Sequence, residues 1–267
     1  MCLYDIIIKP LARNMDTERA SRLGLKYFQL IGKIPFARKF NRLIHSNRQE
    51  GLQREVFGLK FYNPIGLGAG LDLNGELYND LNNLGFSFTE VGPMGVNGTR
   101  KAISHIQRDA PDDIIAACIS KDYLTCFTLA YDFFDMFIID LSEDPATEET
   151  NALLESRITE QEYKPIIIKL PDYINGPELD KIADFCMMNS IDGIELRSNS
   201  QVRQVATHTA GRLPVIANCH IDTPEQAAES LKAGASLVEI RTGLLKEGPD
   251  IVKRTLKYLK NEKAGTI

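Results

Sequence analysis

Residues Asn63–Glu76 read NPIGLGAGLDLNGE, and this stretch decides the fold. The apolar run Ile65–Ala69 predicts a buried strand, and the residues after it predict a turn into a helix that Asp72 or Asn74 would cap. The stretch holds three glycines, Gly66, Gly68 and Gly70. Glycines leave a strand end without side chains, so a flat ring or a phosphate would be able to approach the backbone there. A tight strand-to-helix turn without a ligand explains the same glycines equally well.

The chain after residue 55 repeats this alternation of strand and helix. Eight short apolar runs are expected to form strands: Ile65–Ala69, Phe86–Val91, Ile114–Ile119, Met136–Leu141, Pro165–Leu170, Gly193–Arg197, Leu213–Ala217 and Ser236–Arg241. Helix signals separate them, such as the cap and proline of Thr223-Pro224-Glu225, whereas the polar segment Pro93–Asp113 carries the weakest one. Eight evenly spaced units favour an α/β fold, a (β/α)8 TIM barrel over residues 56–267. An open doubly wound sheet is the alternative.

Residues 1–55 are expected to form a separate helical extension. Two helices are predicted, over Asp16–Ile31 and Phe36–His45, and together they make a hairpin with one apolar and one basic side. Residues 1–60 hold 12 Lys/Arg and 5 Asp/Glu, whereas the remainder holds 19 and 31, so a basic arm is joined to an acidic body. An anionic membrane surface or an acidic partner is therefore a candidate for residues 16–45, and a helix pair packed on the barrel is the simpler alternative.

Composition indicates a reducing compartment and no metal motif. The five cysteines show no CxxC pair and the four histidines make no zinc motif, so free thiols and no metal are expected. The segment Met1–Pro10 lacks a signal-peptide pattern, and no apolar run approaches the ~20 residues that span a bilayer. We expect a cytoplasmic protein, at most peripheral on the inner face of the cytoplasmic membrane. Its expected partner is a small-molecule substrate and not nucleic acid, and a homo-oligomer is left open.

Polar residues follow the predicted strands at their C-terminal ends, the end of a barrel that carries chemistry. In chain order they are Gly70-Leu71-Asp72, Gly92-Pro93-Met94, Ser120-Lys121, Asp140 with Ser142-Glu143-Asp144, Lys169, Arg197-Ser198, Asn218-Cys219-His220 and Arg241-Thr242-Gly243. Because inward positions alternate along a strand, Glu195 shares a face with Arg197, and Glu239 shares a face with Arg241.

Several segments resemble the dihydroorotate dehydrogenase family. They are Gly58–Pro64, Gly66-Leu67, Ala69–Asp72 and Gly75-Glu76 around the first strand, Leu84–Phe86 and Glu90–Gly92 at the second, and Asp122–Leu124, Ile191–Gly193 and Ala233–Val238 further on. Met15–Ala20 is similar to the N-terminal extension of the membrane-associated, quinone-using class. The resemblance implies a flavoprotein of pyrimidine biosynthesis. Such an oxidoreductase binds FMN at the barrel mouth, converts dihydroorotate to orotate and passes electrons to a membrane quinone under the N-terminal helices.

The resemblance also implies roles for individual residues. Lys169 matches the family's lysine beside the flavin, and the family's serine base falls on Glu143, with Ser142 one position away. The implied cofactor-binding residues are Ala69, Gly70, Lys169, Arg241, Thr242 and Gly243. The candidates for contact with a substrate or another anion are Asn74, Asp140, Arg197, Ser198 and His220.

The chain departs from the family at most of these motifs. Leu73 and Pro93 stand where the family has a lysine and a threonine, Cys118 stands where it has an asparagine, and the substrate loop is shortened to about Gly95–Asp113. The family's strand-four ending Asn-x-Ser-Ser-Pro-Asn is replaced by Asp140–Pro145, its phosphate-binding glycines by Asn218-Cys219-His220, and an aromatic residue by Arg241. A phosphate site needs backbone N–H groups with close access, hence glycine.

Three functions follow from these matches and departures. The first is an active FMN-dependent dihydroorotate dehydrogenase with Lys169 beside the flavin and Glu143 or Ser142 as base. The second is a degenerate barrel, a pseudoenzyme or regulatory binding protein, whose mouth is filled by ion pairs of Asp140, Glu143, Glu195 and Glu239 with Lys169, Arg197 and Arg241. The third keeps an anionic ligand near Arg197, His220 and Arg241 with different chemistry.

Electrostatics favour loss of the ancestral reaction. Orotate is an anion, and the chain places carboxylates where the family has neutral side chains. A like-charge contact at about 4 Å costs roughly 1–4 kcal/mol, depending on screening.

Overall fold

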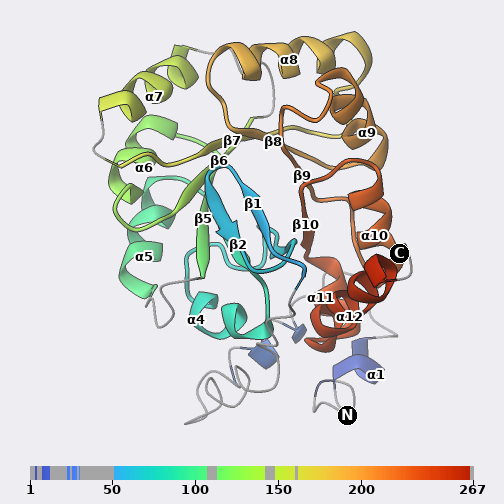
Figure 1. Ribbon diagram of the computed structural model, residues 1–267. Helices are drawn as coiled ribbons and strands as arrows, with labels where there is room; N and C mark the ends of the chain where they lie inside the picture. Colours follow the sequence, from blue (N-terminus) through green and yellow to red (C-terminus); the bar gives the residue numbers. More distant parts are fainter. Residues whose placement is uncertain are drawn as a thin grey trace.

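Eight parallel strands close into a barrel in the order β10-β3-β4-β5-β6-β7-β8-β9 (Figure 1). The computed structural model of the protein describes residues 4, 8–12, 23–24, 26–28, 30, 51–106, 113–141, 148–159 and 162–264. The strands are β3 (Ile65–Leu67), β4 (Phe88–Met94), β5 (Ile114–Ile119), β6 (Met136–Asp140), β7 (Ile166–Lys169), β8 (Gly193–Leu196), β9 (Val215–Ala217) and β10 (Leu237–Ile240). Each overlaps the run predicted for it, so the predicted TIM-barrel fold is confirmed.

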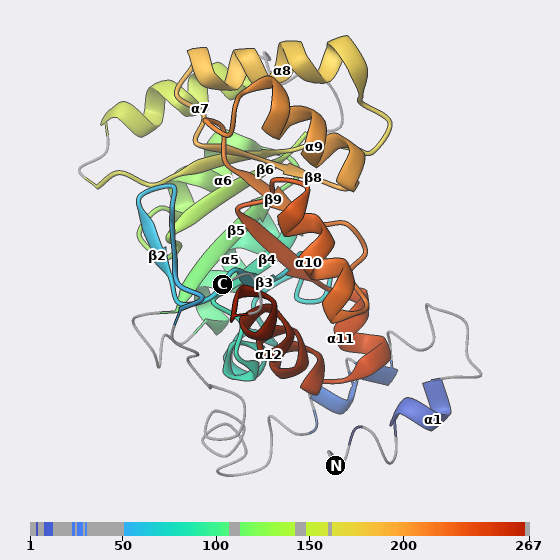
Figure 2. The same cartoon turned by 45° about the vertical axis from the view of Figure 1, so that its right-hand side comes forward.

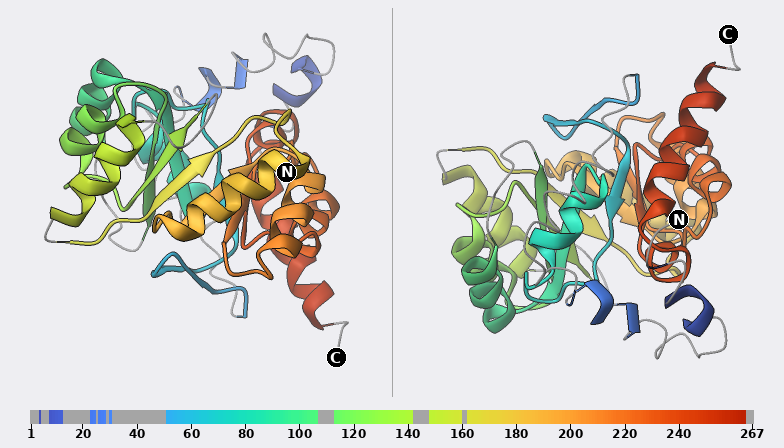
Figure 3. Two further views of the ribbon diagram at one scale, coloured as in Figure 1. Left: turned by 90° about the horizontal axis from the view of Figure 1, so that it is seen from above. Right: turned by 90° about the horizontal axis from the view of Figure 1, so that it is seen from below.

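Helices surround the barrel on its outside (Figures 2 and 3). They are α4 (Tyr78–Leu81) with the 3-10 turn η2 (Asn82–Leu84), α5 (Val96–His105), α6 (Tyr123–Ala130), α7 (Glu148–Thr159), α8 (Gly176–Met188), α9 (Asn199–His208), α10 (Pro224–Lys232), α11 (Thr242–Glu247) and α12 (Asp250–Ala264). The predicted cap of α10 is present, because the Thr223 side chain accepts a hydrogen bond from the Gln226 amide. The segment with the weakest helix signal forms α5, which begins after Gly95 and has no side-chain cap.

The N-terminal half of the barrel interior is apolar. Inward-facing residues of six strands form one buried cluster: Phe88, Ile114, Ala116, Met136, Ile138, Ile167, Ile216 and Leu237. A two-stranded hairpin, β1 (Arg54–Val56) and β2 (Leu59–Phe61), adds Val56 and Phe61 to this cluster and lies across the barrel in Figure 1. The Phe61 ring meets the Phe88 ring edge to face at 5.6 Å between centroids. The hairpin therefore closes the barrel end opposite to the one that carries the strand C-termini.

The described parts of the N-terminal extension pack on α11. The Tyr4 hydroxyl donates a hydrogen bond to the Leu245 carbonyl, and the Tyr4 ring packs against those of Tyr27 and Phe28. A short helix α1 (Lys9–Ala12) is present, and residues 23–24, 26–28 and 30 are helical, within the range predicted for the first helix. The second predicted helix, Phe36–His45, lies outside the described residues, and the division at residues 55/56 stays a prediction. Among the described residues, no helix combines the length and apolar character needed to cross a membrane.

Candidate functional site

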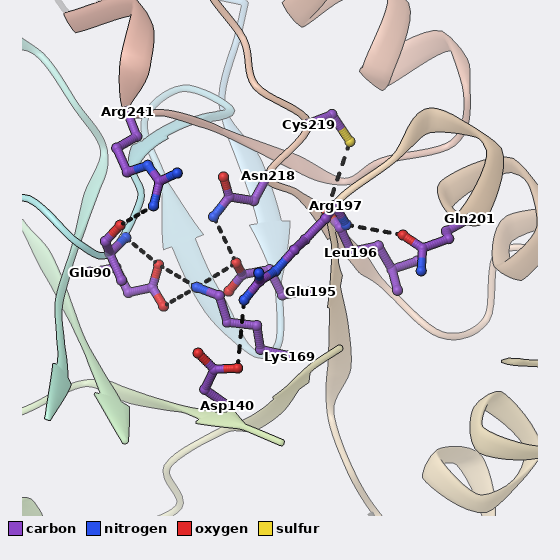
Figure 4. Close-up of polar contacts among 11 residues, drawn as sticks. Glu90, Asp140, Lys169, Glu195, Leu196, Arg197, Gln201, Asn218, Cys219 and Arg241 are labelled. Carbon is purple, nitrogen blue, oxygen red and sulfur yellow. Dashed lines mark hydrogen bonds and ion pairs between the residues drawn. The ribbon is translucent and has the colours of Figure 1, made fainter. Parts of the chain in front are cut away.

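The C-terminal half of the barrel interior carries buried charged side chains, among them Glu90, Lys169 and Glu195 in Figure 4. Four side chains from four strands meet there, Glu90 of β4, Lys169 of β7, Glu195 of β8 and Glu239 of β10, and none is more than 4% exposed. Each lies two residues after an inward apolar or glycine position of its own strand. Strand alternation therefore turns all four to the barrel axis, directly above the apolar cluster.

Lys169 is the centre of this cluster. Its Nζ lies 2.7 Å from Glu195 Oε1 and 3.0 Å from Glu90 Oε1. Burial alone would lower the pKa of Lys169, but the carboxylates of Glu195 and Glu90 outweigh it and hold that pKa well above its ordinary value. The lysine is therefore a cation at neutral pH, and its charge is already matched within the protein.

Glu239 has no such partner. Its carboxyl group meets that of Glu90, and a hydrogen bond forms between them only when one of the two carries a proton. When both are ionised, no donor among the described residues reaches either oxygen of Glu239, and the same holds for Glu195 Oε2. Burial, followed by the nearby charges of Glu195 and Glu90, raises the pKa of Glu239 well above its ordinary value. Burial and the Glu90 charge also raise the pKa of Glu195 to about 7, although Lys169 opposes them. Three carboxyl groups thus face one ammonium group in the buried interior of the barrel.

A partly exposed rim lies above the buried cluster. Arg197, after β8, has a side chain that is 41% exposed, and its Nη2 lies 3.7 Å from Asp140 Oδ1 at the end of β6. Asn218, after β9, donates a hydrogen bond to Glu195 Oε1 at 2.9 Å. Arg241, after β10, donates to the Ala69 carbonyl at 3.4 Å, and Ala69 donates its own N–H to Glu90 Oε2 at 2.7 Å. Ion pairing at the mouth is therefore only partly as expected, because the hydrogen bond of Arg241 goes to a backbone carbonyl.

The glycines of the opening stretch leave room for side chains of this chain. A Cβ on Gly66 would lie 2.1 Å from the Phe88 ring, and one on Gly68 would lie 2.8 Å from Glu239 Oε2. A Cβ on Gly70 would lie 3.1 Å from Arg241 Nη1. The expected ligand-sized space beside β3 is therefore occupied by a ring, a carboxylate and a guanidinium group. The need for glycine comes from close packing across the barrel.

The loop after β9 packs tightly against the start of α11. A Cβ on Gly243 would lie 2.5 Å from the Ile221 carbonyl oxygen, so the backbones touch at this point. The Thr242 hydroxyl donates to Asp222 Oδ1 at 2.6 Å, and Lys246 pairs with the same carboxylate. A carboxylate is thus bound to Thr242, one of the residues that the resemblance assigns to the cofactor.

The remaining predicted residues lie in separate places. Ser142 and Glu143, the candidate bases, lie outside the described residues. Asn74 donates to Glu76 Oε1 at 3.1 Å. Asp72 accepts from the Leu77 amide at 3.0 Å and from the amide of Tyr78, the first residue of α4, so its carboxylate binds amides at the start of that helix.

The last two rim candidates follow β8 and β9. Ser198 caps α9 through Gln201. His220 is exposed, with a left-handed backbone at φ 52°, a conformation in which glycine is favoured.

Glu90 is the residue that sequence reasoning missed. It was visible only as part of the second-strand motif, 79 positions before Lys169, to which it is bonded in the fold. Its position two residues after the inward Phe88 is the signal that would have placed it on the barrel axis.

Comparisons with known proteins agree with the resemblance. A family model described as dihydroorotate dehydrogenase matches residues 192–262. The quinone-type dihydroorotate dehydrogenase of Christiangramia forsetii is 25% identical, over 94% of this chain and 97% of that protein. The quinone-type enzyme of Pasteurella multocida is also 25% identical, over 97% of this chain and all of that protein.

Solved structures give the same result for the fold. The ligand-free dihydroorotate dehydrogenase of Eimeria tenella superposes with a TM-score of 0.75 at 20% identity, covering 94% of this chain and 96% of that one. Its complex with ferulenol gives a TM-score of 0.70 at 17% identity, covering 88% and 93% of the two chains. The predicted resemblance to this family, in sequence and in fold, is confirmed.

Proposed function

We propose that this chain, a divergent homologue of the dihydroorotate dehydrogenases, keeps their barrel without their flavin-dependent reaction and acts as an anion-binding or regulatory pseudoenzyme. The buried cluster carries the proposal. Lys169, the residue matched to the family's flavin-side lysine, is 4% exposed and held between Glu195 and Glu90. The two carboxylates neutralise its positive charge, so Lys169 would stabilise a reduced flavin or a substrate carboxylate only weakly.

Three contacts argue against FMN binding at the residues that the resemblance assigns to the cofactor. Arg241 lies over Gly70, where the resemblance expects the flavin ring. The backbone of Gly243 touches that of Ile221, which removes the open amide surface that a phosphate requires. The Thr242 hydroxyl already donates its hydrogen bond to the Asp222 carboxylate, and this carboxylate would repel a second anion beside it. The residues present do not fit FMN, and no step is assigned to a flavin.

An anion is the ligand class that the rim favours. Arg197, His220 and Arg241 follow β8, β9 and β10, which are neighbours in the barrel. Of the two arginines, Arg197 is the better candidate to bind an anion, because its side chain is 41% exposed and its contact with Asp140 is long, at 3.7 Å. Arginine forms strong, two-pronged hydrogen bonds to carboxylates and phosphates.

The second candidate function is the family's own reaction, dihydroorotate oxidation with FMN and a quinone acceptor. Full-length similarity to quinone-type enzymes favours it, together with the retained lysine at position 169. It also needs a base from Ser142 or Glu143 and a quinone route through residues 16–45. Both candidate bases lie outside the described residues, and only residues 23–24, 26–28 and 30 of the second segment are described.

A turnover assay separates the two functions. The purified protein is assayed for dihydroorotate oxidation with a soluble quinone and added FMN, beside the Pasteurella multocida enzyme. The proposal expects no turnover above background. It also expects orotate or inorganic phosphate to raise the thermal midpoint, less in Arg197→Gln than in the control Arg203→Gln, an exposed arginine of α9. Turnover comparable to that of the relative, lost in Lys169→Met, would establish the second function instead.

A further inference from the structure

The buried acidic residues at the barrel axis are not balanced by the charges around them. Glu90, Glu195 and Glu239 carry three carboxyl groups, and Lys169 is the only cation bonded to them in the described part of the chain. If all are ionised, two negative charges stay unmatched at 0–1% exposure. Unpaired buried charge is costly, so the cluster requires two further positive charges.

The unpartnered oxygens point to where that charge lies. Glu195 directs Oε1 to Lys169 and leaves Oε2 without a donor, and Glu239 leaves both oxygens without one among the described residues. Both side chains are at least 99% buried. Glu239 reaches into the space beside Gly68, where a Cβ would lie 2.8 Å from its Oε2. Fully buried acceptors without donors are rare in proteins and indicate a missing partner.

The geometry of the three carboxylates suits a cation of moderate size. One oxygen from each of the three residues can be chosen so that no two are more than 4.8 Å apart. A point within about 2.8 Å of all three therefore exists, which is 4.8 Å divided by the square root of three. Calcium binds oxygen at roughly 2.3–2.6 Å, so a small inward movement of the side chains would complete three ligands, whereas magnesium, at roughly 2.0–2.1 Å, would require a larger one.

We propose that Glu90, Glu195 and Glu239 form a binding site for one calcium-sized divalent cation inside the mouth of the barrel. Its two charges balance the cluster, Lys169 keeps its contacts to Glu195 Oε1 and Glu90 Oε1, and water supplies the remaining ligands. Asn218 and Arg241, which follow β9 and β10, are half-buried. The alternative source of positive charge is two protons on the carboxyl groups, and the experiment decides between them.

The inference is independent of the proposed function, because its readouts involve neither flavin nor dihydroorotate. Protein prepared without a metal-affinity step is stripped with EDTA and dialysed against Ca²⁺ or Mn²⁺. Elemental analysis then gives the number of bound ions, and calorimetry gives their affinity. The expected result is one ion per chain and a higher thermal midpoint with the ion. The affinity should fall at least tenfold in Glu239→Gln and stay within twofold in Glu225→Gln, an exposed glutamate of α10.

Three results would overturn the cation site. Wild-type protein that retains no ion and shows no change in thermal midpoint would mean that protons balance the cluster. Binding that is equally strong in Glu239→Gln would place the ion elsewhere. If Glu239→Gln does not fold, Glu195→Gln takes its place, and unchanged affinity there has the same meaning.

Discussion

Replacing Lys169 by methionine should destabilise the protein far more than the same replacement of an exposed lysine. Methionine has a similar length but no charge, so the variant leaves Glu90 and Glu195 buried without their cation. At an effective dielectric constant of about 20, each ammonium–carboxylate contact near 3 Å carries roughly 5–6 kcal/mol of gross attraction, and desolvation cancels much of it. Breaking a buried ion pair costs about 3–5 kcal/mol net. For a chain of this size that lowers the thermal midpoint by on the order of 10 °C.

The assay is equilibrium unfolding in urea with EDTA present, so that no divalent cation contributes. Lys253→Met, an exposed lysine of α12, is the matched control and should change the free energy of unfolding by less than about 0.5 kcal/mol. The double variant Lys169→Met/Glu195→Gln should regain at least half of the loss, since it removes one of the stranded charges. A loss in Lys169→Met no larger than in the control would refute the ion-pair account of the barrel mouth.

Three further predictions test other parts of the structure. Gly66→Ala should lower the free energy of unfolding in urea by about 1–3 kcal/mol, because its Cβ would lie 2.1 Å from the Phe88 ring. Adding Phe88→Leu should restore part of that loss. Full stability in Gly66→Ala would contradict the packing. Thr223→Ala should cost about 1 kcal/mol by removing the acceptor for the Gln226 amide, and a stabilised variant would contradict the cap. Burial raises the pKa of Cys219 to about 11. Its alkylation should therefore be slow at pH 8, and the rate should rise about tenfold for each pH unit up to that pKa. The rate is followed by peptide mass spectrometry, and a rate independent of pH would contradict the raised pKa.

The fold could be predicted because its signals are local. Each barrel strand is a short apolar run bounded by turn residues. The start of a helix such as α10 is predicted by a capping residue followed by a proline. The helix α5 has a weak start signal in the sequence, because it begins after Gly95 and no side chain caps it.

The site could be predicted only in part, because its contacts are distant in sequence. Alternation placed Glu195 and Glu239 on the barrel axis, and the match of Lys169 to the family placed it nearby. The bond between Lys169 and Glu90 spans 79 positions and depends on how the barrel closes, which no local pattern encodes. The sequence left two explanations open for the glycines for the same reason, since the group beside Gly68 is Glu239 from the last strand.

The visible absorption spectrum of the purified protein, before and after incubation with excess FMN and gel filtration, tests the central claim most directly. The account predicts a colourless protein that retains no FMN, because Arg241 lies beside Gly70 and Asp222 is bonded to Thr242, two of the residues that the resemblance assigns to the cofactor. A yellow protein with one FMN per chain would contradict it and show that the barrel mouth opens to admit the cofactor.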